Sequence, residues 1–246
     1  MKIAVLSDIH SNLEALEACC RLARQQGVER FACLGDFVGY GADPVATLDL
    51  VLSLPGLIAV LGNHDESIIV FGKEAVPNPF VRHTREWARR RLRPEHLEYL
   101  RSLPYVHAEK DVTYVHASAR HPHDWEYLRN VRQAEACLRA ARTSLVFIGH
   151  GHVPTIFCRG AGGVTTEMDA AEGAPLVLAP GNAYVVNVGS VGQPRDGNSA
   201  ACFAMHDDNA RTVTFHRVAY DHAAAAAKIR AAGFDPFFAD RLSRGH

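Results

Sequence analysis

The stretch KIAVLSDIH (residues 2–10) contains a short apolar run that ends directly in polar side chains. Ile3–Leu6 combines β-branched and aliphatic residues, which is typical of a buried strand. Asp8 and His10 follow at the point where such a strand ends. The stretch therefore predicts a central strand that delivers a carboxylate and an imidazole to one edge of a sheet.

The same arrangement of an apolar run followed by polar side chains occurs four more times. The runs are Arg30–Leu34 before Asp36, Leu57–Leu61 before Asn63, Val112–Val115 before His116, and Leu145–Ile148 before His150 and His152. Ser11 and Glu14 have the spacing of a capping box and mark the start of a first helix. Two further helical patterns cover Pro44–Leu54 and Asn130–Arg142. Alternating strands and helices predict an α/β fold whose parallel strands carry these side chains to a common edge.

The remaining sequence adds helices and hairpins. Residues 66–102 have a helical pattern, interrupted at Val76-Pro77-Asn78-Pro79 and at Pro94, and are expected to form a helical cap segment. Strand-like runs lie at Thr155–Cys158, Ala183–Val188, Ala200–Met205 and Thr212–Val218, and about the last 25 residues are helical in pattern. No repeat, linker or break in composition divides the chain, so a single domain over residues 1–246 is predicted.

The composition excludes several classes of protein. Lys+Arg 26 against Asp+Glu 27 gives a formal charge of -1, which carries no strong signal for nucleic-acid binding. No apolar run approaches the roughly 20 residues that cross a bilayer, and the N-terminus lacks the pattern of a signal peptide, so a cytoplasmic protein is expected. The six cysteines form no C-x-x-C pair and lie mostly in apolar stretches, which predicts reduced thiols in the core.

The polar side chains at the strand ends are candidate metal ligands. They are Asp8, His10, Asp36, Asn63, His116, His150 and His152. Each motif alone is common as a turn or a helix cap, but five successive strand ends of this kind favour a shared site. Carboxylate, imidazole and amide groups without thiolate suit Mn, Fe, Zn or Ni.

The motifs together resemble a known family. D-x-H (8–10), G-D (35–36), G-N-H-D (62–65), a histidine after a strand (116) and G-H-x-H (149–152) are similar to the calcineurin-like metallophosphoesterase superfamily. The stretches LGDFVGYGADP, GHGHVP and NVGSVGQPRDG look most like its compact bacterial phosphodiesterase or diadenosine-tetraphosphatase-like branch. This resemblance implies an α/β fold, a four-layer α/β/β/α sandwich of two mixed sheets, with a dinuclear metal site at the carboxyl ends of the strands.

The resemblance also implies a role for each site residue. Asp8, His10 and His152 would hold one divalent ion, Asn63, His116 and His150 a second, and Asp36 would bridge the two, with manganese favoured. His64 would face the scissile phosphate and assist the leaving group, with Asp65 orienting its ring. Asn12 would support the ligands through a hydrogen bond, and Arg195 would contact the substrate phosphate.

The expected activity is hydrolysis of a small or nucleotide-type phosphodiester by a metal-bridging hydroxide. The alternatives are a phosphomonoesterase acting on a small metabolite or a phosphoprotein and, in a different class, a protein-binding scaffold without activity. Phe37-Val38-Gly39-Tyr40 follows Asp36 where protein Ser/Thr phosphatases and symmetrical dinucleotide hydrolases carry an arginine, which argues against those activities. The arginine-rich helix at residues 82–93 is expected to be a solvated face rather than a phosphate-binding lid, and the oligomeric state is left open.

Overall fold

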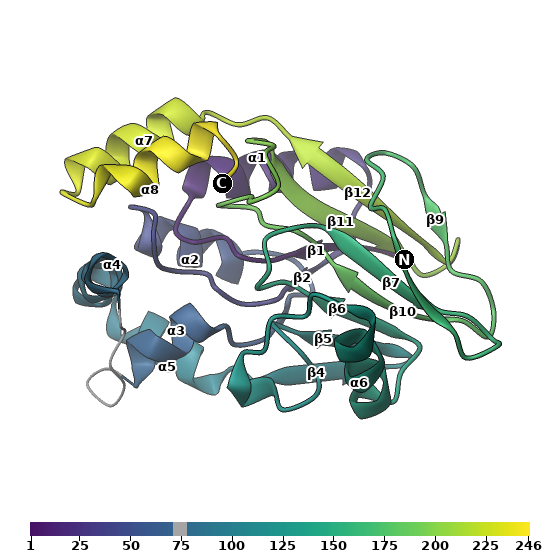
Figure 1. Cartoon of the computed structure of the whole chain (residues 1–246). Coiled ribbons are helices and arrows are strands. Elements are labelled where there is room, and N and C mark those ends of the chain that lie inside the picture. Colours follow the sequence, from purple (N-terminus) through teal and green to yellow (C-terminus); the bar gives the residue numbers. More distant parts are fainter. Residues whose placement is uncertain (71–77) are drawn as a thin grey trace.

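Two mixed β-sheets lie face to face at the centre of the protein (Figure 1). The computed structural model describes residues 1–70 and 78–246. The first sheet consists of β3 (Ile58–Ala59), β2 (Arg30–Cys33), β1 (Lys2–Leu6), β11 (Ala201–Asp207), β12 (Thr212–Val218) and β9 (Leu176–Val177), in that order. The second consists of β4 (Val106–Glu109), β5 (Val112–Val115), β6 (Leu145–Ile148), β10 (Ala183–Asn187), β7 (Thr155–Arg159) and β8 (Thr165–Met168).

Each sheet has a parallel half that leads to the predicted ligands and an antiparallel half. In the first sheet β1, β2 and β3 are parallel, whereas β1 pairs antiparallel with β11. In the second, β6 runs parallel to β5 and to β10, and β7 and β8 continue the sheet antiparallel. The carboxyl ends of β1, β2, β3, β5 and β6 are the points from which the predicted ligands follow.

Helices cover the outer faces of both sheets. They are α1 (Leu13–Gln25), α2 (Pro44–Leu52), α3 (Asn63–Ile69), α4 (Pro79–Arg91), α5 (Pro94–Ser102), α6 (Val131–Ala141), α7 (His222–Ala231) and α8 (Pro236–Asp240), with short 3-10 helices at Pro122–Asp124 and Arg241–Ser243. Figure 1 shows α1 and α2 on the outer side of the first sheet and α6 on the outer side of the second. The described residues include no helix that is both long and apolar enough to span a membrane.

Alternation along β1 explains the four layers. Ile3 and Val5 pack between the two sheets with Phe147 of β6, whereas Ala4 and Leu6 face α1. On the far side, Val146 of β6 packs against α6. Burying an aliphatic or aromatic side chain contributes about 1.5–3 kcal/mol, so both faces of each sheet are covered. The predicted α/β/β/α sandwich of two mixed sheets is confirmed.

The structure refines the predicted elements. Val112–Val115, Leu145–Ile148 and Thr212–Val218 are strands with the predicted bounds. Ser11 does not cap α1: Asn12 is the cap, and its side chain accepts a hydrogen bond from the backbone N–H of Ala15 at 3.2 Å. β4, β8 and β9 were not predicted, because they are short and only weakly apolar. All six cysteines are buried and free, as expected.

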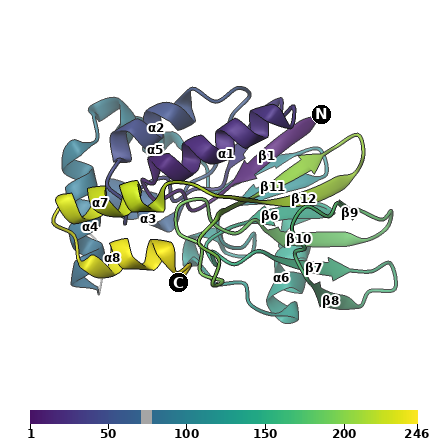
Figure 2. The same ribbon diagram turned by 90° about the horizontal axis from the view of Figure 1, so that it is seen from above.

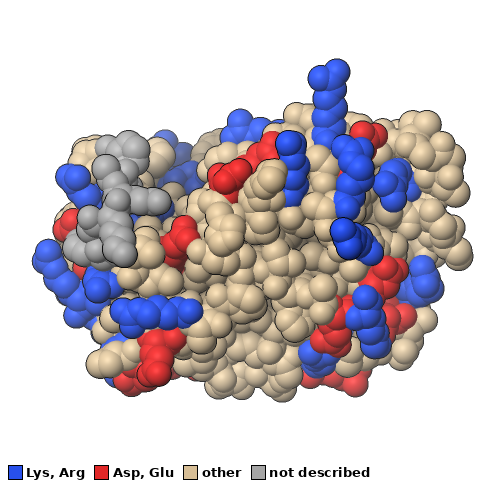
Figure 3. Space-filling view, turned by 90° about the horizontal axis from the view of Figure 1, so that it is seen from below, with Lys and Arg blue, Asp and Glu red and all other residues tan. Residues whose placement is uncertain are grey.

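The described residues of the predicted cap segment include most of α3 and the whole of α4 and α5. The Val76-Pro77 part of its predicted interruption lies outside the described residues, and Asn78 caps α4 ahead of Pro79. α7 and α8 lie beside α4 at the same end of the molecule (Figures 1 and 2), where Phe234 contacts His83 and Trp87. This end of the molecule adjoins the predicted ligands. On the face shown in Figure 3, acidic and basic side chains occur close to one another.

Candidate metal centre

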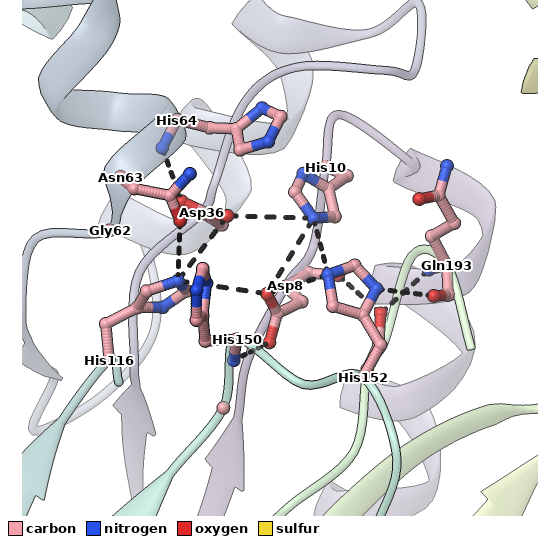
Figure 4. Close-up of polar contacts among 12 residues, drawn as sticks. Asp8, His10, Asp36, Gly62, Asn63, His64, His116, His150, His152 and Gln193 are labelled. Carbon is pink, nitrogen blue, oxygen red and sulfur yellow. Dashed lines mark hydrogen bonds and ion pairs between the residues drawn. The ribbon is translucent and has the colours of Figure 1, made fainter. Parts of the chain in front are cut away.

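The loops that follow five strands meet in one buried crevice, and they bring all seven predicted ligands together (Figure 4). Ligand atoms lie within 4.8 Å of one another in three groups: Asp8 with His10 and His152, Asp36 with His116 and His150, and His10 with Asp36 and His64. Asn63 completes the set, with its Oδ1 3.2 Å from Nε2 of His116. The strands come from both sheets, β1, β2 and β3 from one and β5 and β6 from the other. The common edge that the strand–helix alternation predicts is therefore shared between two sheets.

Three of the histidines are held by main-chain carbonyl groups on the side away from the crevice. Nδ1 of His10 lies 3.3 Å from the carbonyl oxygen of Val38, and Nδ1 of His116 lies 2.7 Å from that of Leu34. Nδ1 of His152 lies 2.6 Å from the carbonyl oxygen of Gln193. A carbonyl oxygen only accepts, so each Nδ1 carries a hydrogen, and in its neutral form each ring turns the lone pair of Nε2 into the crevice.

These lone pairs face one another without a proton between them. Nε2 of His10 lies 3.2 Å from Nε2 of His152. Oδ1 of Asp8 lies 3.1 Å from the same atom of His152, yet it is buried and lacks a hydrogen-bond partner within the described part of the chain. Nε2 of His150 is likewise buried and unpartnered among these residues. Such an inward-facing set of nitrogen and oxygen donors fits a divalent cation.

The backbone at most of the candidate ligands has a strained, left-handed conformation. Five of the seven ligands have left-handed backbone conformations: Asp8 (φ 53°), His10 (φ 50°), Asp36 (φ 53°), His150 (φ 62°) and His152 (φ 59°). This conformation costs a non-glycine residue on the order of 1–3 kcal/mol and is concentrated at functional sites. The close approach of the loops adds a further constraint, because a Cβ at Gly149 would lie 1.8 Å from Oγ of Ser7.

Charge in the crevice is divided between anionic carboxylates and neutral imidazoles. Burial alone would raise the pKa of Asp8 and Asp36, but the surrounding imidazoles outweigh it and hold both pKa values below their usual range. Burial lowers the pKa of His10 to about 3 and that of His150 to about 4. For His116 burial is outweighed by Asp36 and Asp8, and its pKa rises to about 9. A proton on His116 thus occupies the position that a cation would take.

His64 lies at the edge of the crevice, and its ring accepts a hydrogen bond from the cap segment. Its backbone N–H donates to Oδ1 of Asp36 at 2.8 Å. Nε–H of Arg85 donates to its Nδ1 at 3.3 Å. Burial, with the charge of Arg85, lowers the pKa of His64. A neutral ring whose Nδ1 accepts this hydrogen bond carries its hydrogen on Nε2.

Arg85 was expected on a solvated helix face, and this expectation is wrong for that residue. Arg85 is partly buried beside His64, whereas Arg90, on the same helix α4, has a side chain that is 77% exposed. Helical spacing alone does not show which stripe of an arginine-rich helix turns inward. Packing of α4 over α3 decides it.

Asp65 and Asn12 bond to main-chain groups that support the crevice. The carboxylate of Asp65 accepts from the backbone N–H groups of Gly62 and Val38, at 3.2 and 3.3 Å, and the ring of His64 is contacted instead by Arg85. Burial and the charge of Asp36 raise the pKa of Asp65. Asn12 donates to the carbonyl oxygen of Gly192 at 2.9 Å, next to the residue that holds His152.

Arg195 lies beside the crevice, with a donor still available. Its backbone N–H donates to the carbonyl oxygen of His152, and its guanidinium donates to Gln193 at 3.2 Å. Within the described ranges its buried Nε has no hydrogen-bond partner. An arginine with an unused N–H group next to candidate metal ligands is suited to an anionic oxygen of a ligand.

Sequence reasoning did not find two aromatic side chains at the crevice. The ring of Tyr40 lies 4.6 Å from that of His10 and 4.5 Å from that of His64, measured between centroids. Tyr127 stacks on His150 at 4.1 Å with an interplanar angle of 22°. Tyr40 follows the G-D motif by only four residues, so its position in the sequence could have suggested that it lies near the crevice. No ligand motif lies that close to Tyr127 in the sequence.

Comparison with known proteins agrees with this geometry. A crystal structure of a metallophosphoesterase from Sphaerobacter thermophilus superposes with a TM-score of 0.89 at 40% identity, covering 100% of this chain and 99% of that one. An uncharacterised protein of Methanocaldococcus jannaschii is 34% identical over 99% of this chain and 98% of its own length.

A more distant similarity concerns a protein with a named activity. A symmetrical bis(5'-nucleosyl)-tetraphosphatase of Coxiella burnetii is 26% identical over 133 residues, which are 53% of this chain and 46% of that protein. Residues 1–210 match the calcineurin-like phosphoesterase superfamily domain, whose members use divalent metals. The chain therefore belongs to the calcineurin-like phosphoesterase superfamily and is a phosphoesterase.

Proposed function

We propose that the protein hydrolyses a phosphodiester of nucleotide type with the help of two divalent ions, manganese being favoured. The observation that carries the proposal is the pair of Nε2 atoms of His10 and His152, which lie 3.2 Å apart while both Nδ1 atoms point to main-chain carbonyl oxygens. Asp8, His10 and His152 would hold one ion, Asn63, His116 and His150 the other, and Asp36 would serve both. When bound, a pair of cations supplies an activated water and a clamp on the phosphoryl group.

His64 is the candidate proton donor to the leaving oxygen. With Nδ1 occupied by Arg85, its hydrogen resides on Nε2, where an imidazole can donate. The lowered pKa of His64 leaves the ring neutral around pH 7, so its Nε2–H would stabilise the negative charge on the leaving oxygen through a hydrogen bond. Transfer of a full proton would require the protonated imidazolium, because a neutral ring that lost its only N–H would become an anion. Asp65 supports the loop rather than the ring, through Gly62 and Val38.

Two arginines supply positive charge for the substrate. Arg85 reaches His64 from α4, and Arg195 presents an unpartnered Nε beside His152, judged within the described residues. Guanidinium groups bind phosphate oxygens through paired hydrogen bonds. We infer that Arg195 contacts a non-bridging oxygen of the substrate. The inference fails if Arg195→Ala leaves both kcat and KM unchanged.

Preference for a diester over a monoester is supported by the space beside the crevice. Arg195 lines two separate cavities, one of about 360 Å³ that includes Tyr40 and one of about 370 Å³ that includes Tyr127. Each of these tyrosines also packs on a candidate ligand. A phosphodiester has two ester groups to accommodate, whereas a monoester has one.

The test is hydrolysis of bis-p-nitrophenyl phosphate against p-nitrophenyl phosphate by manganese-loaded protein, with bound metal counted in the same samples. We expect a clear preference for the diester, loss of turnover on chelation, and recovery when manganese is restored. His64→Ala should lower kcat about 10²- to 10⁴-fold while both ions stay bound. A preference for the monoester would move the assignment to a phosphatase, and activity unchanged in His64→Ala would exclude that residue as the acid.

A further inference from the structure

One cavity next to the metal centre is built partly by residues outside the family-matched region 1–210. Its volume is about 360 Å³. The side chains that matter are Tyr40, Phe80, Arg195, Phe237, Phe238 and Arg241. Phe80 lies on α4, and Phe237 and Phe238 lie on α8, so the cavity is where the cap segment and the C-terminal helices meet over the crevice.

The aromatic walls of this cavity are exposed to an extent that packing does not explain. Phe80 is 54% and Phe237 is 59% exposed, and both line the same cavity. Two large apolar rings held in water around one concave site are typical of a surface that binds a ligand. Phe238 is buried beneath them and forms the floor.

Tyr40 joins the cavity to the metal centre. Its ring stacks on Phe238, with centroids 5.3 Å apart, and also packs on His10 and His64. The turn that places it is strained: Tyr40 has φ 59°, and a Cβ at Gly39 would lie 2.4 Å from Nδ1 of His64. A ligand that reaches from the crevice along Tyr40 therefore enters the aromatic cavity directly.

Two arginines and one carboxylate, that of Asp235, line the same cavity. Within residues 1–70 and 78–246, neither Arg195 nor Arg241 forms an ion pair. Arg241 donates to the main-chain oxygen of His246 and lies over the ring of Phe237 at 4.9 Å. Burial and the charge of Arg195 lower the pKa of Arg241 to about 10. Asp235 also lines the cavity, where one of its oxygens accepts from the backbone N–H of Phe237.

We propose that this cavity binds the nucleoside of a nucleotide ester whose phosphate lies at the metal centre. The base stacks on Phe80 and Phe237, and Arg195 and Arg241 neutralise the phosphate side of the ligand. The proposal rests on the proposed function of the crevice. It adds that the cavity on the rim of the crevice selects nucleotide esters as the substrate class. Two exposed rings, two arginines without an ion pair among the described residues, and the tyrosine shared with the metal centre line this cavity.

The test measures binding rather than turnover. Isothermal titration of manganese-loaded protein compares two methylenephosphonates, one an analogue of adenosine 5'-monophosphate and the other of ribose 5-phosphate. A CH2 group replaces the ester oxygen in both, so neither can be hydrolysed. We expect the adenosine analogue to bind about tenfold or more tightly, since stacking of one base is worth that much. Phe237→Ala should bring the ratio close to one, and Phe237→Tyr should preserve it.

A matched pair of charge variants tests the arginine. Arg241→Ala should weaken both analogues about tenfold, whereas Arg244→Ala, which removes an exposed charge three residues away, should change neither. Equal affinity of the two analogues for the unaltered protein overturns the proposal, as does a base preference that survives Phe237→Ala. Failure of catalysis is detected separately, because absence of bis-p-nitrophenyl phosphate hydrolysis would refute the proposed function and leave this ratio measurable.

Discussion

The crevice and the cavity on its rim differ in almost every physical property. The crevice ligands Asp8, His10 and His116 are at most 1% exposed and are held by the loops of two sheets. The rim rings Phe80 and Phe237 are more than half exposed and lie on α4 and α8. The crevice lies inside residues 1–210 that match the family, whereas α8 lies beyond them.

This difference separates two tasks within one active site. Metal-assisted hydrolysis needs donors fixed to a fraction of an ångström, and a strained backbone between two packed sheets provides that. Choice of substrate needs surface that can vary without disturbing those donors. The exposed side chains of Phe80 on α4 and Phe237 on α8 provide it, because these two rings lie outside the buried clusters of the core.

The largest expected effect comes from breaking the crevice itself. Asp36→Asn removes a negative charge that we assign to both ions, and we expect activity to fall about 10³-fold or more, with fewer than two ions bound. Atomic absorption measures the number of bound ions, and the rate of bis-p-nitrophenyl phosphate hydrolysis measures the activity. Asp169→Asn, an exposed carboxylate, is the control and should change neither. Full activity in Asp36→Asn would remove the metal centre from the mechanism.

A smaller effect should come from Arg85, which reaches the edge of the crevice from α4. Arg85→Ala removes the donor to Nδ1 of His64, so the ring is free to adopt the wrong tautomer, and kcat should fall about 10- to 100-fold. Arg90→Ala on the same helix changes an exposed charge and should have no such effect. The pH profile of kcat should change in Arg85→Ala only. Equal rates for Arg85→Ala and Arg90→Ala would show that α4 is a solvated helix without a role in catalysis.

Metal affinity should depend on pH through His116. Its pKa of about 9 in the metal-free protein means that an entering cation displaces a proton, so affinity rises about tenfold per pH unit below that value. His10 and His150, with pKa values of about 3 and 4, are already neutral and add no slope above about pH 5. Titration of manganese in two buffers of different ionisation enthalpy, from about pH 7.5 to 9, counts the protons released. Affinity that does not vary with pH would contradict the assignment.

The smallest effect concerns support behind the crevice. Asn12→Ala and Asn130→Ala each remove a helix cap, from α1 and α6, and each should lower the free energy of unfolding by about 1 kcal/mol. Only Asn12 also bonds to Gly192, beside the carbonyl that holds His152. Chemical denaturation should therefore give similar losses, whereas metal affinity should fall only in Asn12→Ala. Equal metal affinity in both variants would show that Asn12 acts as a cap alone.

What the sequence predicted well was local. Strand ends such as those before Asp8 and His116 are visible because apolar runs and the polar residues after them are neighbours in the chain. The predicted ligands follow from that pattern and from the family resemblance. The division of the five strands between two sheets does not, since it depends on pairing such as that of β1 with β11, about 200 residues apart.

What the sequence did not predict depends on tertiary packing. Arg85 and Arg90 are equivalent by composition, and only the seating of α4 turns one of them toward His64. Phe237 reaches the crevice from nearly 200 residues beyond Tyr40, with no motif to link them. The partners of Asp65 are backbone groups, which sequence patterns do not reveal.

The left-handed backbone at Asp8 and Asp36 has a consequence for evolution. Asparagine adopts that conformation more readily than other residues with a side chain, and a single nucleotide substitution converts an aspartate codon into an asparagine codon. A descendant of this protein can thus lose the charges that attract cations without disturbing the loops. A single substitution of this kind would abolish metal-dependent catalysis while the fold is kept, and the unchanged surface could then be selected for binding.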